Sequence, residues 1–66
     1  MEKERMLKWF AFDHLPDDLQ TYSEPFNTLA TYIVQHVEPG PERTVALRKL
    51  LEGRDATLRS VQIPGG

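Results

Sequence analysis

The sequence has 66 residues, which is room for one domain, and it contains no cysteine, which excludes disulfides and thiolate metal sites. A chain this short buries only about 60% of the surface that it exposes when unfolded, so we expect it to need a partner for stability. A formal net charge of −2 and a pI near 5.5 argue against a general nucleic-acid binder. No apolar stretch approaches the ~20 residues that cross a membrane.

Residues 2–10 are predicted to form a short helix, with Met6, Leu7 and Phe10 on its apolar side and Trp9 as a further candidate for that side. A connector follows, because the residue before Pro16 is pushed out of the α region. Within it, Phe12 either anchors the chain through hydrophobic contact or offers an aromatic surface on which a base can stack. His14 is either a turn or cap residue or a catalytic group, and the first interpretation is favoured.

Residues 16–37 are predicted to form a first long helix, and the acidic residues after Pro16 favour the positive end of a helix dipole. Pro25 lies within the apolar pattern, which favours one helix bent at this proline. The alternative is a break, with Ser23 capping a second helix. The apolar residues recur at steps of three and four: Leu19, Tyr22, Phe26, Leu29, Ile33 and Val37.

Two prolines bracket Gly40 and predict that one helix stops and another starts. The second long helix is expected over 41–62, and 63–66 are expected to form a frayed tail. The tight connection predicts that the long helices pack as an antiparallel hairpin. The predicted fold class is therefore all-α: a short N-terminal helix and a two-helix hairpin in one domain over 1–62, which assembles as a homo-oligomer.

Charge is divided unevenly along the chain. Residues 1–40 hold three basic and seven acidic residues, whereas residues 41–66 hold five basic and three acidic ones. On a helical wheel, one arc of the second long helix is apolar and is predicted to face the first: Leu47, Leu50, Leu51, Leu58 and Val61. A polar stripe lies beside this arc and comprises Thr44, Arg48, Glu52, Asp55 and Arg59.

The arginines of this helix fall into two pairs with the same eleven-residue spacing, about three turns. Arg48 and Arg59 belong either to a solvated face of ion pairs or to a site for an anionic ligand. Arg43 and Arg54 project into the apolar arc. Arg54 either extends its head group to water, pairs with a carboxylate across an oligomer interface, or binds a phosphate.

Catalytic constellations are missing from the sequence. It has no glycine-rich phosphate loop, no H-E-x-x-H and no nucleophile elbow. Ser23 and Ser60 have no orienting base at a recognisable spacing. We therefore expect that the protein is not an enzyme, and that it holds no cofactor and no metal.

Three runs of residues occur in an order that resembles a known family: FAFDHLP at 10–16, PERTVALRKLLE at 41–52 and RDATLR at 54–59. They resemble the small phage hairpin domain shared by anti-CBASS and anti-Thoeris proteins, over most of the chain. Members of that family bind cyclic oligonucleotide or cyclic ADP-ribose messengers of bacterial defence systems without cleaving them. They fold as a short helix and a two-helix hairpin and assemble into compact oligomers, including hexamers.

The resemblance implies roles for particular residues. In the family an aromatic before the histidine stacks on a base of a cyclic dinucleotide, and Phe12 is the nearest match, without a tyrosine hydroxyl. Arg59 matches an arginine that contacts the phosphates of cyclic trinucleotides. The family's lysine on the first long helix has no counterpart here, where Asn27 or Thr28 falls near its place. The dinucleotide pocket therefore departs from the family pattern.

From these features we expect a phage sponge that sequesters a cyclic oligonucleotide in the cytoplasm of the infected bacterial host, as a homo-oligomer and, by the resemblance, a hexamer. Membranes and duplex nucleic acid are not expected partners. One rival is a helical oligomerisation or adaptor module without a small-molecule ligand, and the other is a DNA-associated hairpin. The predicted ligand-binding residues are Phe12, His14, Asn27, Thr28, Arg43, Thr44, Arg48, Arg54 and Arg59.

Overall fold

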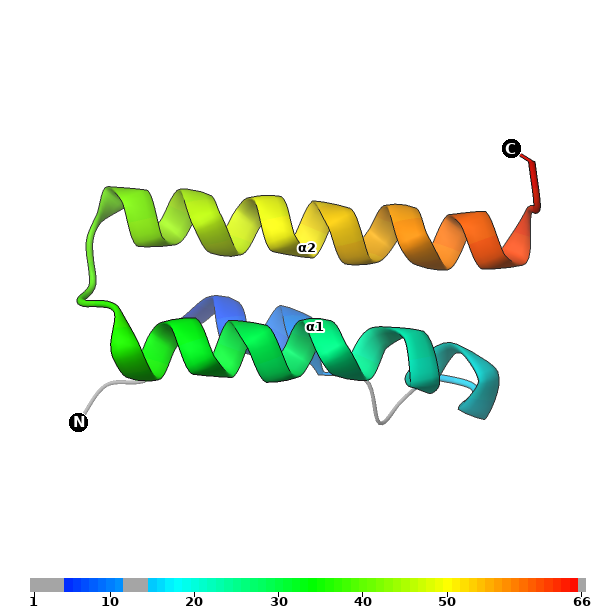
Figure 1. The fold of residues 1–66 in the computed structure, drawn as a ribbon, viewed down its shortest axis with the longest axis horizontal. Coiled ribbons are helices and arrows are strands. Elements are labelled where there is room, and N and C mark those ends of the chain that lie inside the picture. Colours follow the sequence, from blue (N-terminus) through cyan, green and yellow to red (C-terminus); the bar gives the residue numbers. More distant parts are fainter. Residues whose placement is uncertain (1–4, 12–14, 66) are drawn as a thin grey trace.

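The computed structural model describes residues 5–11 and 15–65, the first two of them as backbone only. Phe12 and His14, both predicted to bind ligand, lie outside the described residues. The described part is helical, with short turns and no strand. Figure 1 shows two long antiparallel helices side by side, and the molecule measures 38 by 21 by 15 Å. The predicted all-α hairpin is confirmed.

The first long helix, α1 (Asp17–His36), begins directly after Pro16. The Pro16 carbonyl accepts a hydrogen bond of 3.0 Å from the backbone N–H of Gln20, and the Gln20 side-chain amide donates to the carbonyl of Leu15 at 2.7 Å. Acidic residues occupy the first turn, where the positive end of the helix dipole favours them. The helix start thus agrees with the prediction to within one residue.

The helix α1 runs unbroken through Pro25, so the alternative of a break with a cap at Ser23 is wrong. Proline has no N–H, so the carbonyl of Thr21 loses its helical hydrogen bond. Packing of both halves of α1 against the rest of the molecule offsets this loss, because tertiary contacts supply most of the stability of a helix. Ser23 is fully buried in the middle of the helix.

The second long helix, α2, spans Pro41–Gln62, as predicted. Proline is favourable at its first position, where an N–H would have no helical partner. Thr44 secures this end, because its backbone N–H and its hydroxyl both donate to the Gly40 carbonyl, at 3.1 and 3.3 Å. The backbone N–H of Ile63 closes the other end through a 2.8 Å bond to the carbonyl of Arg59.

The segment predicted as a short helix over 2–10 contains a 3-10 helix, η1 (Arg5–Phe10), which lies against both long helices and behind them in Figure 1. The fully buried Phe10 of η1 forms the centre of the core with Ala30 and Leu47. Half-buried hydrophobic residues surround this centre: Leu7, Phe26, Ile33, Val34, Leu50 and Leu51.

The buried side of α1 differs from the predicted apolar stripe. Leu19, Ser23 and Ala30 are buried, whereas Tyr22 and Leu29 are 45% and 46% exposed. Small side chains at two of the buried positions let the neighbouring elements approach α1 closely, and the Phe10 ring fills the remaining space. The prediction followed hydrophobicity. It was right for Leu19, Phe26 and Ile33, and it wrongly extended the contact to Tyr22 and Leu29.

Candidate functional site

A row of exposed side chains runs along one side of α2, and we call this row the outer face. Its members recur at steps of three and four residues, so they line up along the helix. Arg48 and Arg59 supply its positive charge, and their shared direction is the one that the sequence predicted. The outer face comprises Val45, Arg48, Glu52, Ala56, Arg59 and Ile63.

The carboxylates near the outer face pair with other cations. Glu52 lies 3.7 Å from the ammonium group of Lys49, and Asp55 accepts hydrogen bonds from Arg54. Within the described part of the chain, Arg48 and Arg59 form no ion pair and no hydrogen bond. Their guanidinium groups keep all their donors for water or for an anion, and a planar fork of donors suits a phosphate.

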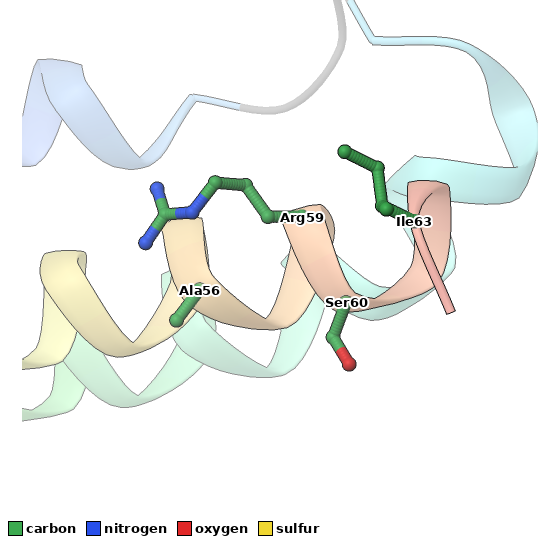
Figure 2. A pocket seen from close by; sticks show the side chains of 4 residues that line it. All are labelled: Ala56, Arg59, Ser60 and Ile63. Carbon is green, nitrogen blue, oxygen red and sulfur yellow. The ribbon is translucent and has the colours of Figure 1, made fainter. Parts of the chain in front are cut away.

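Arg59 borders a shallow depression of about 320 Å³ near the end of α2, which Ala56, Ser60 and Ile63 also line. Figure 2 shows the side chains of Arg59 and Ile63 on the same side of the helix, with the guanidinium group turned back toward the preceding turn, while Ala56 and Ser60 project to the other side. A charged group and an apolar wall thus lie next to each other. The volume is at the low end for ligand pockets, ~300–1,000 Å³, so one chain can hold only part of a cyclic oligonucleotide.

Arg43 points into the hairpin and is only 8% exposed. Its Nη1 donates to the carbonyl of Val37 at 2.9 Å and to that of Val34 at 3.4 Å. These carbonyls belong to the end of α1, where the last C=O groups lack helical partners and the dipole favours a cation. Arg43 therefore holds the end of α1 against the start of α2. The neighbouring Thr44, also a predicted ligand contact, has its hydroxyl bonded to Gly40.

Arg54 joins η1 to α2. Its Nη1 donates to the carbonyl of Trp9 at 2.7 Å, while its Nε and Nη2 donate to Asp55 at 3.1 and 2.8 Å. The side chain is 14% exposed. The sequence left open whether Arg54 pairs with a carboxylate across an oligomer interface. It does pair with a carboxylate, but this is Asp55 of the same chain. This arginine therefore has a structural role.

The remaining predicted residues lie on α1. Asn27 is half-buried there, and Thr28 is exposed. Thr28 lines a second shallow depression, of about 520 Å³, together with Thr21, Glu24, Pro25, Leu29 and Tyr32. Among the described residues of one chain, the predicted residues therefore lie in separate places, with Arg59 at one depression and Thr28 at the other.

Sequence reasoning missed an exposed apolar row on α1 that includes Tyr22, Leu29 and Tyr32. Tyr32 stacks on His36, with ring centroids 4.0 Å apart and an angle of 24° between the planes. In the sequence, this row is a second series of apolar residues at steps of three and four, beside the buried series. The prediction assigned two of its members, Tyr22 and Leu29, to the contact between the helices.

In the described part of the chain, no group of three histidine or acidic residues is placed to hold a metal ion. None of the helices described there is long and apolar enough to span a membrane. Comparison of the chain with protein-family models, with curated proteins and with solved structures gives no match. The resemblance to the phage hairpin family therefore rests on the three sequence motifs alone.

Proposed function

We propose that the protein is a phage anti-defence sponge, which binds a cyclic oligonucleotide messenger in the cytoplasm of the infected host and sequesters it without cleavage. The observation that carries this proposal is the position of Arg59. Its side chain is exposed, borders a depression of about 320 Å³, and has no partner among the described residues.

The proposal depends on the different positions of the arginines. Arg43 and Arg54 are engaged with backbone carbonyls of their own chain, so they are not offered to a ligand. Arg59 keeps its donors, and two parallel N–H groups of a guanidinium group bind a phosphate with both geometric specificity and charge. The apolar wall from Ile63 then covers part of a sugar or base. A sponge needs affinity alone, and this combination provides it without any catalytic group.

One copy is too small for the whole messenger, so the proposed site forms between copies of the chain in a homo-oligomer, a hexamer by the resemblance. Rotational symmetry repeats Arg59 around an axis and turns a charge on a helix edge into a convergent ring of charges. Arginines brought together in this way repel one another, and a cyclic anion with two or three phosphates relieves that repulsion. The assembly and the ligand thus stabilise each other.

The proposal is tested by titration calorimetry and thermal melting with a panel of cyclic dinucleotides, cyclic trinucleotides and cyclic ADP-ribose isomers. We expect one class to bind and to raise the melting temperature, because a ligand of the folded state stabilises that state. Chromatography of the released ligand should recover it intact. A wild-type protein that binds no member of the panel contradicts the proposal.

A matched pair of variants locates the site. Arg59→Ala should weaken messenger binding by about 10- to 100-fold, the value of a charge-assisted hydrogen bond of ~1.5–3 kcal/mol, without changing the assembly. Lys49→Ala removes another exposed cation of α2, which pairs with Glu52, and should leave binding unchanged. Equal binding by Arg59→Ala and wild type rules out the proposed site.

The exposed row on α1 favours a second candidate, an oligomerisation or adaptor module without a small-molecule ligand. Tyr22, Leu29 and Tyr32 are between 45% and 57% exposed, which is typical of a surface that contacts another protein. The two candidates differ in their response to Arg59→Ala. The sponge loses messenger binding and stays assembled, whereas the module either loses its assembly or shows no change.

A further inference from the structure

One flank of α1 carries a series of exposed residues that we call the α1 stripe. Its large apolar members are 45% (Tyr22), 46% (Leu29) and 57% (Tyr32) exposed, although each lies on a helix whose other side is in the core. The steps along the stripe are four, three, four, three and four residues, the pattern of a helix-packing seam. The α1 stripe comprises Asp18, Tyr22, Pro25, Leu29, Tyr32 and His36.

The molecule exposes more surface than its mass requires. Its accessible surface is 5020 Å², whereas a folded monomer of 7.6 kDa is expected to expose about 4,300 Å². The excess, about 700 Å², is close to the ~800 Å² that each partner buries in a stable protein–protein interface. The additional exposed area is therefore comparable with one side of a stable interface. Three members of the α1 stripe, Pro25, Leu29 and Tyr32, line the shallow depression of about 520 Å³.

The α1 stripe is complementary to itself. Its steps read the same from either end, so a second α1 that lies antiparallel meets it in register. Tyr22 then lies opposite Tyr32 of the other copy, and Pro25 lies opposite Leu29. Each contact occurs twice, as a two-fold axis requires.

The helix dipoles favour the same arrangement. The first turn of α1, which contains Asp18, comes opposite the last turn of α1 of the other copy, which contains His36. Antiparallel packing also places the positive end of each helix dipole beside the negative end of the other. A parallel arrangement instead brings Asp17 and Asp18 of both copies together, and α1 has no lysine or arginine to compensate them.

We infer that a second copy of this chain binds at the α1 stripe, with the two α1 helices antiparallel about a two-fold axis. This inference deepens the proposed function and rests only on its assembly part, not on the messenger. The contact uses α1 and leaves the outer face of α2, with Arg59, open to a ligand or to further copies.

Sedimentation velocity at micromolar concentration without nucleotide provides the first test. Leu29→Asp places a charge in the centre of the α1 stripe and should reduce the wild-type assembly to smaller species, with association at least about 100-fold weaker, the cost of an uncompensated buried charge. Ala46→Asp introduces the same charge at an exposed alanine of α2 that belongs to neither the α1 stripe nor the outer face, and it should sediment as the wild type does. Circular dichroism shows that each variant keeps its helices.

Because the sequence contains no cysteine, disulfide crosslinking provides a second test, which reports on the register of the two α1 helices. Tyr22→Cys and Tyr32→Cys should form a disulfide under mild oxidation when the two variants are mixed, because the inference places these positions opposite each other. Each variant alone should stay uncrosslinked, because the same residue of the two copies lies about 15 Å apart along the axis, beyond the reach of a disulfide.

The outcomes separate this inference from the messenger proposal. A Leu29→Asp protein that assembles as the wild type does overturns the α1 interface, and so does crosslinking in the single-variant samples or none in the mixture. Either result leaves the sponge proposal standing, because messenger binding is measured separately on the same proteins. A wild-type protein that is monomeric at these concentrations overturns the interface and the assembly together.

Discussion

Two pairs of arginines on α2 have the same eleven-residue spacing, but they differ in burial and in hydrogen-bond partners. Arg43 and Arg54 face the hairpin, are largely buried, and donate to carbonyls of Val37 and Trp9. Arg48 and Arg59 lie on the exposed side and have no partner within the described residues. The residue type is the same in both pairs, so the direction from the helix axis decides whether an arginine holds the fold together or is offered to a ligand.

The inward pair, Arg43 and Arg54, adds hydrogen bonds between elements that also pack through hydrophobic contacts. A helix of this hairpin ends with carbonyl groups that have no helical donor, and a short 3-10 helix ends in the same way. The guanidinium group reaches such carbonyls from a neighbouring element and satisfies them. Few large side chains are fully buried among the described residues, so we expect these polar contacts to add to the stability that the small hydrophobic core provides. The outward pair contributes no such contact.

Among the four arginines, we expect the substitution of Arg43 to have the largest effect on stability. Arg43→Ala leaves carbonyls at the end of α1 without their donor and should lower the free energy of unfolding by about 2–3 kcal/mol, or the melting temperature by roughly 10–20 °C. Thermal melting at fixed protein concentration checks this. Arg43→Lys keeps the charge but not the fork of donors and should recover only part of the loss. If Arg43→Ala melts at the same temperature as the wild type, Arg43 has no structural role.

Arg54 should show a smaller and more local effect. Arg54→Ala removes the 2.7 Å bond to the Trp9 carbonyl, and we expect a loss of about 1–2 kcal/mol, because Phe10 still holds η1 in the core. Trp9 is the only tryptophan, so its fluorescence emission reports on the release of η1. Unchanged emission together with unchanged stability shows that the bond does not hold η1 in place.

The outward pair should have the smallest effect on stability. Arg48→Ala and Arg59→Ala should each change the free energy of unfolding by no more than about 0.5 kcal/mol, as is usual for exposed positions without partners. Urea unfolding of both variants without nucleotide measures this. A large loss in either variant places that arginine in an interface between copies and removes the contrast between the two pairs.

The sequence predicted the hairpin well because its signals are local. Pro39, Gly40 and Pro41 separate the two long helices, and the limits of α2 are those expected from proline at its start and apolar periodicity along it. The passage of α1 through Pro25 was also the favoured interpretation. The side of α1 that faces the core was predicted only in part. Leu19 is buried and Phe26 and Ile33 pack against the core, as predicted, whereas Tyr22 and Leu29 are exposed.

The candidate site was predicted only in part. The common direction of Arg48 and Arg59 followed from helical geometry, but their freedom from ion pairs did not, since Glu52 and Asp55 were equally close in sequence to several cations. Asn27, Thr28 and Thr44 lie apart from Arg59 in a single chain. Whether copies of the chain bring them together is a property of the assembly.

By itself, the sequence determined where the helices begin and end, because prolines, glycine and first-turn acidic residues act on the backbone within a few residues. Only the tertiary structure decided which arginines stabilise the fold and which remain exposed. That choice depends on where η1 lies, since Phe10 fills the space over Ala30 and Trp9 offers its carbonyl to Arg54. Arg54 and Trp9 are 45 positions apart, and no local pattern specifies such a contact.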